Sequence, residues 1–339
     1  MPRYIGVDLH TNCFTVCVLT SKGESSFQEY KLSGLAGFRK TLRRSDQLAV
    51  EATGNARFFS EQVRGRVGRI IVVNPRQFEV IKQSRSKTDK RDAYNLALYL
   101  SKGLLPEARM KSETEARLSS LVQTRDKLVK ARTQLKNKLH GLLISHGLES
   151  RREAYSSERG LERVLAVEAF GEITRIEVEV IVSQVRSLNQ SIRRLDEEIE
   201  RQGAQLEGHD SLTSIKGIGT RSATILLSVI GKVEDFADEN KLASYFGIVP
   251  VVKQSNETER HGRITKAGSK LGRTTLVQCT LVAIRHSPYL KQFYERTKAR
   301  RGTGKAIIAT ARKFLGIVYR TLKNKWVFAD FPNFVLAER

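Results

Sequence analysis

Short apolar runs alternate with helically spaced segments over the first hundred residues. Residues 4–9 and 13–19 are apolar runs on either side of Thr11 and Asn12, a pattern that predicts two strands joined by a turn. The same criteria predict strands at 48–51 and 69–73 and helices at 35–44, 58–67 and 87–98. Alternating strands and helices are typical of an α/β layer architecture.

The pattern changes to long amphipathic helices over residues 112–206. Heptad-like leucines occupy positions 118, 121, 128, 135, 139 and 142, and a second apolar series runs from Ile176 to Leu206. A polar segment, 149–159, separates the two series. We expect an antiparallel coiled-coil arm or a dimerisation element, and two helices packed on their own domain are the alternative.

Residues 212–224 follow the arm and contain two glycines, Gly217 and Gly219, between Lys216 and Arg221. The segment resembles the hairpin of a helix-hairpin-helix motif, in which glycines let the backbone approach a phosphate and the next helix presents free N–H groups to it. This predicts a sequence-independent DNA contact. A glycine-containing turn between two helices, with no ligand, is the alternative.

Net charge narrows the choice of partner. The chain of 339 residues carries a formal charge of +23, which indicates a polyanionic partner, with nucleic acid as the first candidate and an anionic membrane surface as the second. The start of the sequence does not resemble a signal peptide, and no run has the ~18 apolar residues of a membrane span. We expect a soluble, cytoplasmic protein with no membrane partner.

Most of the excess charge lies near the C-terminus. Residues 253–325 hold 18 Lys or Arg and three acids. The run 298–305 predicts a mobile basic loop near phosphates, and it does not match a P-loop, so we expect no ATP site. Basic residues expected to bind nucleic acid, in addition to Lys216 and Arg221, are Arg263, Lys266, Lys270, Arg273, Arg300, Arg301 and Lys305.

Four acids have the pattern of a metal site. Asp8 lies in the first predicted strand and Glu51 ends another, while Asp89 and Asp92 are three residues apart on one predicted helix face. A ribonuclease-H-like fold places metal-binding carboxylates at such positions. Together they predict an oxygen-ligand site for Mg²⁺, and two such ions can assist an in-line phosphoryl displacement. Any one of these acids alone would be interpreted as an ordinary exposed residue.

With these parts in order, the chain resembles the transposases of the insertion-sequence family numbered one hundred and ten, which are related to Piv-type DNA invertases. The resemblance rests on I-G-V-D-L-H at Asp8, V-E-A-T-G-N at Glu51, S-K-T-D-K-R-D-A at Asp89 and Asp92, and a C-terminal block from Tyr245 to Ser269. It implies a RuvC-like (RNase H-like) catalytic domain at 1–105, a helical coiled-coil arm at 106–207 and a mainly helical, basic transposase domain at 208–339.

The resemblance also implies a chemistry. The four acids would bind Mg²⁺, as two ions, and Ser255 would attack a DNA phosphate to form a phosphoserine link that conserves the energy for rejoining. Two departures from the family pattern, Asn256 after Ser255 and Gly272 where leucine is usual, leave Ser269 as the alternative nucleophile. The implied partners are double-stranded donor and target DNA, a structured guide (bridge) RNA and further copies of the chain, as a dimer or tetramer associated with the nucleoid.

Two other functions remain open at this point. One is a metal-dependent, junction-resolving nuclease that uses the same acids with water as nucleophile. The other is an architectural nucleic-acid-binding protein without enzymatic activity, for which the acids would be surface residues. A Piv-like invertase is a variant of the recombinase interpretation.

Overall fold

The chain folds into two compact units, Met1–Lys111 and Ser112–Arg339, which are described separately. The computed structural model describes residues 2–75, 78, 88–149, 151, 155–255 and 258–338, of which the segments 253–255 and 258–261 are described by their backbone alone. The three-part division expected from the sequence stays a prediction.

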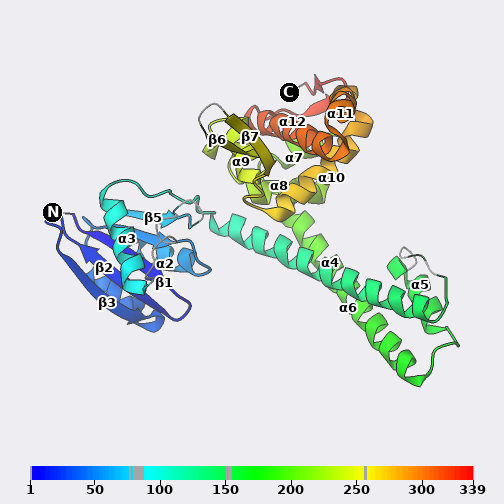
Figure 1. The fold of residues 1–339 in the computed structure, drawn as a ribbon, viewed down its shortest axis with the longest axis horizontal. Helices are drawn as coiled ribbons and strands as arrows, with labels where there is room; N and C mark the ends of the chain where they lie inside the picture. The colour runs from blue at the N-terminus through cyan, green and yellow to red at the C-terminus, as the bar shows by residue number, and fades with distance from the viewer. Residues whose placement is uncertain are drawn as a thin grey trace. The chain divides into compact units, whose positions relative to one another are not determined.

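The first unit is built on a five-stranded mixed sheet (Figure 1). The strand order is β3-β2-β1-β4-β5, in which β1, β2 and β3 pair antiparallel and β1, β4 and β5 pair parallel. The strands are β1 (Tyr4–Leu9), β2 (Cys13–Leu19), β3 (Ser25–Lys31), β4 (Gln47–Glu51) and β5 (Arg69–Val73). All the strands and helices predicted for this segment are present, so the α/β expectation is confirmed.

Helices cover both faces of this sheet. On one face, Ile5, Val7 and Val50 form a core with α1 (Leu35–Thr41) and α2 (Ala56–Val63). The 3-10 turn η1 (Leu32–Gly34) precedes α1, and the 3-10 turn η2 (Arg64–Arg66) follows α2. On the other face, α3 (Asp89–Ser101) packs against β1, β2 and β4. Successive strand residues face opposite sides, so Gly6 and Asp8 lie on the α3 side.

The edge strand β3 was missed by the sequence analysis because its residues are almost entirely exposed and lack apolar alternation. The tyrosine Tyr30 connects it to the core, since its ring stacks on Phe14 with centroids 5.2 Å apart.

The second unit begins with two long helices, α4 (Glu113–Ser145) and α6 (Glu172–Gly203), that lie side by side (Figure 1). They run antiparallel, because Arg125 near the start of α4 pairs with Asp196 near the end of α6, and Lys138 pairs with Glu177. The connection was expected to be a polar loop, but it also contains α5 (Glu158–Leu165), which packs on α6. Whether these helices form a coiled-coil or dimerisation arm stays a prediction.

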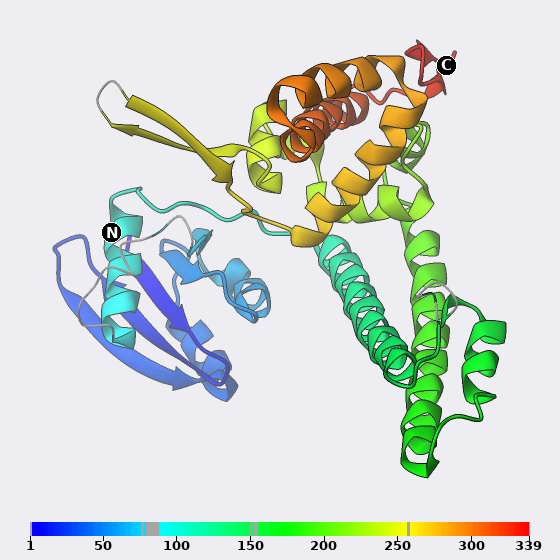
Figure 2. The ribbon, with the colours of Figure 1, turned by 45° about the vertical axis from the view of Figure 1, so that its right-hand side comes forward.

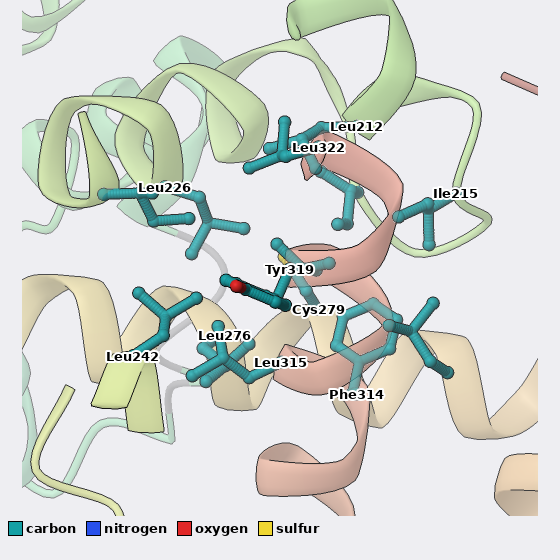
Figure 3. Close-up of a cluster of buried hydrophobic side chains, with 14 of the residues drawn as sticks. Leu212, Ile215, Leu226, Leu242, Leu276, Cys279, Phe314, Leu315, Tyr319 and Leu322 are labelled. Carbon is teal, nitrogen blue, oxygen red and sulfur yellow. The ribbon is translucent and has the colours of Figure 1, made fainter. Parts of the chain in front are cut away.

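The rest of this unit is mainly helical, as expected. Its elements are α7 (His209–Thr213), α8 (Thr220–Ile230), η5 (Val233–Asp235), α9 (Glu239–Phe246), β6 (Pro250–Ser255), β7 (Thr258–Ile264), α10 (Lys270–His286), α11 (Pro288–Arg301), α12 (Thr303–Lys323), β8 (Phe328–Asp330) and β9 (Val335–Leu336). Figure 3 shows part of their shared core, where Phe314 and Tyr319 of α12 lie among leucines from several helices. The Tyr319 hydroxyl donates to the carbonyl of Phe236 at 3.1 Å.

The basic run 298–305 was predicted to be a mobile loop, and this was wrong. Residues up to Arg301 belong to α11 and residues from Thr303 onward belong to α12. Only Gly302 stands between the two helices, with φ of 77°, so a single left-handed residue makes the corner without a loop.

Among the described residues, no helix combines the length and the apolar character that crossing a bilayer requires.

Candidate active site

Two of the predicted acids lie at the ends of neighbouring parallel strands. β1 and β4 pair with Val7 opposite Val50, so the next residues on each strand, Asp8 and Glu51, come side by side. Parallel strands bring their carboxyl ends to the same edge of a sheet. The adjacency predicted from sequence is thus found in the fold.

The other two acids occupy the first turn of α3. Thr88 caps this helix, since its hydroxyl accepts a hydrogen bond from the Arg91 N–H, and the helix begins at Asp89. Asp92 is nearly buried, with 3% of its surface exposed, whereas Asp89 is exposed. The negative side chains also favour this end of the helix, where its dipole is positive.

Close contact between α3 and β1 depends on Gly6. A Cβ atom at Gly6 would lie 2.0 Å from the carbonyl oxygen of Ala93 and 2.6 Å from the amide nitrogen of Ala97. Glycine therefore lets the helix backbone lie directly on the strand. This contact brings the first turn of α3 to the strand that carries Asp8.

The other three acids influence the ionisation of Asp8. The pKa of Asp8 is raised to about 6 from its ordinary value of 3.8, chiefly by burial, while the nearby His10 lowers it. The charges of Asp89, Asp92 and Glu51 make smaller contributions to this increase. A carboxylate that is 7% exposed and faces three others is destabilised in its charged form.

A histidine that the sequence analysis quoted but did not assign joins this cluster. The Nε2 atom of His10 lies 3.4 Å from Asp8 Oδ2 and 3.3 Å from Asp89 Oδ2. One donor atom from each of these three residues lies within 4.8 Å of the other two. The sequence shows a histidine two positions after the strand aspartate. The direction of its side chain, however, depends on how the turn folds.

This donor set fits a divalent cation. Carboxylate oxygens are ligands that Mg²⁺ and Mn²⁺ accept, and imidazole nitrogen is a common transition-metal ligand. The charges of the other three acids contribute to the raised pKa of Asp8, and a positive ion among the acids would offset that repulsion. Of the four predicted acids, Asp8 and Asp89 thus lie with His10 in a group that could hold a metal ion, while Glu51 and Asp92 lie outside this group of donor atoms and stay predicted ligands.

Ser255, the predicted nucleophile, is carried by the other unit. It is the last residue of β6, and its Cα pairs with that of Thr258 across the hairpin. Figure 2 shows this two-stranded hairpin extending from the helices of its own unit. The Ser255 side chain lies outside the described residues.

Ser269, the alternative nucleophile, has a structural role. It is the N-cap of α10, and its Oγ accepts a hydrogen bond from the Gly272 N–H at 3.0 Å. Gly272 itself is buried, and a Cβ there would lie 3.1 Å from a methyl group of Val229. The glycine in place of leucine thus fits the packing of α8 against α10.

The predicted DNA-binding hairpin, 212–224, comprises the end of α7, the turn that follows it and the start of α8. Gly217 has φ of 109°, and a Cβ there would lie 2.8 Å from the Ala283 amide and the Cys279 carbonyl. This glycine is therefore required by packing on α10. Gly219, which precedes α8, has open space around it, so a role in phosphate binding stays a prediction for that residue.

The predicted basic residues divide into exposed and engaged side chains. Arg221 forms ion pairs with Asp196 and Glu200. The Arg273 guanidinium donates to the carbonyl oxygens of Phe246 and Ala267, at 3.2 and 2.5 Å. The exposed ones are Lys216, Arg263, Lys266, Lys270, Arg300, Arg301 and Lys305.

Two family models match separate segments of the chain. Residues 5–146 match a transposase family model of the DEDD type found in IS110 elements. Residues 209–295 match the model described as transposase, IS116/IS110/IS902 family. The first segment contains all four acids and the second contains both candidate serines.

Relatives match along nearly the whole chain. The transposase for insertion sequence element IS1111A of Coxiella burnetii is 25% identical over 334 residues, covering 95% of this chain and 90% of the relative. The pilin gene-inverting protein of Moraxella lacunata is 27% identical over 351 residues, covering 96% and 97%. This chain therefore belongs to the IS110/IS116 family of transposases and is a DNA recombinase enzyme.

Proposed function

We propose that this chain cuts and rejoins DNA through attack of the Ser255 hydroxyl on a backbone phosphate, assisted by Mg²⁺ bound at Asp8, Glu51, Asp89 and Asp92. The observation that carries the metal part is the group of donor atoms from Asp8, His10 and Asp89, which lie within 4.8 Å of one another, and the charges of Asp89, Asp92 and Glu51 contribute to the raised pKa of Asp8. The sheet order 3-2-1-4-5, with acids at the ends of the two central strands, supports a RuvC-like catalytic domain.

The covalent step balances without an external energy source. The Ser255 oxygen forms a bond to phosphorus, the bond from phosphorus to a sugar oxygen breaks, and the proton of the serine leaves to solvent or a neighbouring base. The freed sugar hydroxyl of another strand end then attacks the phosphoserine and restores the serine. Bound Mg²⁺, as two ions, would neutralise charge on the phosphate and lower the proton affinity of the attacking hydroxyl.

The four acids would hold the Mg²⁺ ions that assist this chemistry. Asp8 and Glu51 are fixed by strand pairing, and Asp92 is fixed by the contact of α3 with Gly6. Side chains on rigid elements keep their geometry during a reaction better than side chains on loops. The role of Ser269 as an N-cap favours Ser255 over Ser269 as the nucleophile.

Nucleic acid would be held by the exposed basic side chains of the second unit. Arg263, Lys266 and Lys270 lie along the segment from the end of β7 to the start of α10, and Arg300, Arg301 and Lys305 lie at the corner of α11 and α12. Such side chains bind phosphates and give sequence-independent affinity. Target choice would come from a structured bridge RNA encoded by the element, and the active form would be a dimer or tetramer acting on donor and target DNA in the cytoplasm.

A gel assay tests the covalent step. The purified chain, the candidate RNA, element-end DNA and Mg²⁺ are incubated and separated under denaturing conditions, together with Ser255→Ala and Asp8→Asn. A protein–DNA adduct that is lost in both variants is expected. Cleavage without an adduct, unchanged in Ser255→Ala, would instead identify a water-using nuclease.

Inversion of a DNA segment is a second candidate outcome of the same chemistry. The similarity to the Moraxella pilin gene-inverting protein along 96% of the chain supports it. A plasmid with element ends in inverted orientation distinguishes the two outcomes, because inversion changes the restriction pattern without loss of the segment.

A further inference from the structure

His10 follows β1 directly and points at the gap between two of the proposed metal ligands. Its Nε2 atom is 3.4 Å from Asp8 Oδ2 and 3.3 Å from Asp89 Oδ2. The side chain is 45% exposed. Neither the four-acid pattern nor the family comparison gives this histidine a role.

The backbone of His10 is fixed on both sides of its Cα. Its N–H donates to the Cys13 carbonyl at 2.9 Å, and its carbonyl accepts from the Asn55 side chain at 2.8 Å. Asn55 in turn accepts a hydrogen bond from the Thr53 hydroxyl at 3.0 Å. The turn after β1 is therefore tied to the turn that follows Glu51, and both turns border the acidic cluster.

The side chain of Asn55 does not cap its own helix. It is the N-cap residue of α2, yet its side chain makes no capping hydrogen bond. A capping asparagine normally stabilises its helix by about 1 kcal/mol. Here the amide donates to the backbone carbonyl of His10 instead, which fixes the backbone position from which the imidazole extends.

The distances around His10 suit metal coordination. Ligand atoms about 2.1 Å from an octahedral ion lie about 3 Å from their nearest neighbours, close to the separations of 3.3 and 3.4 Å between His10 Nε2 and the two carboxylates. The same distances also suit an ion pair between imidazolium and carboxylate. One donor atom from each of the three residues lies within 4.8 Å of the other two, so a single ion can contact all three.

We propose that His10 supplies an imidazole nitrogen ligand to a divalent ion held by Asp8 and Asp89, so that the site accepts first-row ions such as Mn²⁺ and Co²⁺ as well as Mg²⁺. Carboxylates alone suit Mg²⁺, whereas imidazole increases the affinity for transition ions. The inference rests on the proposed metal site and adds a fifth protein ligand to it. Asn55 is then a positioning residue that acts through His10.

Pulsed electron paramagnetic resonance of the full chain with Mn²⁺ tests this directly, since a coordinated imidazole gives an electron spin echo modulation from directly bound ¹⁴N. The variants are His10→Gln, Asp8→Asn and, as a matched control, His286→Gln at the exposed end of α10. We expect ¹⁴N modulation in the unaltered chain and in His286→Gln, and its loss in His10→Gln. Mn²⁺ binding is expected to weaken more than Mg²⁺ binding in His10→Gln.

The remaining outcomes separate this inference from the proposed function. Mn²⁺ bound in an Asp8-dependent manner without ¹⁴N modulation would overturn the role of His10 and leave the acidic site in place. Modulation that persists in His10→Gln would assign the nitrogen to another histidine and also overturn it. Mn²⁺ binding that is unchanged in Asp8→Asn would overturn both the inference and the metal site.

Discussion

Gly6 of β1 lies so close to Ala93 of α3 that a single added methyl carbon would stand 2.0 Å from the Ala93 carbonyl oxygen. The two atoms of α3 nearest to this carbon are the Ala93 carbonyl oxygen and the Ala97 amide nitrogen. Both belong to the backbone, so no side-chain rotation can relieve the clash. The separation between strand and helix that places Asp92 beside Asp8 is therefore set by the absence of a side chain at one position.

Gly6→Ala is expected to displace α3 from the sheet. Overpacking against a rigid backbone should cost about 2–3 kcal/mol or more in the free energy of unfolding, and the affinity for Mg²⁺ should fall because Asp92 moves with the helix. Urea unfolding followed by circular dichroism and calorimetric Mg²⁺ titration measure the two effects. Gly37→Ala in α1, where a Cβ would meet nothing within 4 Å, should leave metal affinity unchanged.

This contact illustrates how far the sequence could predict the site. The two strand acids and the D-x-x-D helix follow from local patterns, because strand ends and a three-residue helical spacing are visible in the chain itself. The role of Gly6 could not be derived in this way, since it depends on which helix crosses the strand. Sequence patterns predict the elements, while the approach of one element to another is a tertiary property.

His10 was missed for a related reason. The turn that carries it is fixed by a hydrogen bond from Asn55 to the His10 backbone carbonyl, and Asn55 lies 45 positions away in the sequence. The basic run 298–305 shows the opposite error, because glycine and charge together predicted a loop where Gly302 only turns the chain between two helices. Composition alone could not distinguish a one-residue corner from a mobile segment.

Asp8→Asn is expected to stabilise the chain in the absence of divalent ions. The folded-state pKa of Asp8, about 6, lies above its unfolded value, so the folded state binds more protons between those two values. The protonated carboxyl of Asp8 therefore contributes stability that is fully present below about pH 4 and is lost progressively as the pH rises through about 6. At pH 7 in EDTA, the neutral asparagine should raise the free energy of unfolding by roughly 1–3 kcal/mol.

Added Mg²⁺ should reverse this order. The unaltered chain gains stability because the ion binds only its folded form, whereas Asp8→Asn gains little. Thermal unfolding with EDTA and with Mg²⁺, at pH 5 and pH 7.5, measures both effects. A variant that is less stable than the unaltered chain in EDTA at pH 7.5 would contradict the repulsion among the acids.

Substitution of Ser269 should affect the free energy of unfolding, whereas substitution of Ser255 should affect adduct formation. Ser269→Ala removes the N-cap of α10 and is expected to cost about 1 kcal/mol, with adduct formation retained. Ser255→Ala should abolish the adduct without a comparable loss of stability. The single tryptophan, Trp326, packs against the core of this unit, so its fluorescence in urea reports the stability of both variants. An adduct lost in Ser269→Ala but kept in Ser255→Ala would exchange the two assignments.

The glycines of the α7–α8 turn should also differ. Gly217→Ala places a methyl group 2.8 Å from the backbone of α10 at a φ of 109°, so it should destabilise the unit by about 2 kcal/mol or more. Gly219→Ala meets open space and should leave stability nearly unchanged. If this turn contacts a phosphate, Gly219→Ala weakens DNA binding in a gel-shift assay at full stability; equal DNA affinity would remove the turn from the DNA-binding surface.

The corner of α11 and α12 should contribute to DNA affinity in a salt-dependent way. Arg300, Arg301 and Lys305 are exposed on the two sides of Gly302, and each phosphate contact contributes about 0.9 to the slope of log affinity against log salt concentration. The triple change to glutamine should therefore reduce that slope by about 2–3, with similar losses for unrelated DNA sequences. A matched triple, Arg159→Gln, Arg163→Gln and Arg194→Gln on α5 and α6, removes the same charge from exposed positions elsewhere in the unit. Equal slopes for the two triple variants would mean that net charge, and not this corner, determines the affinity.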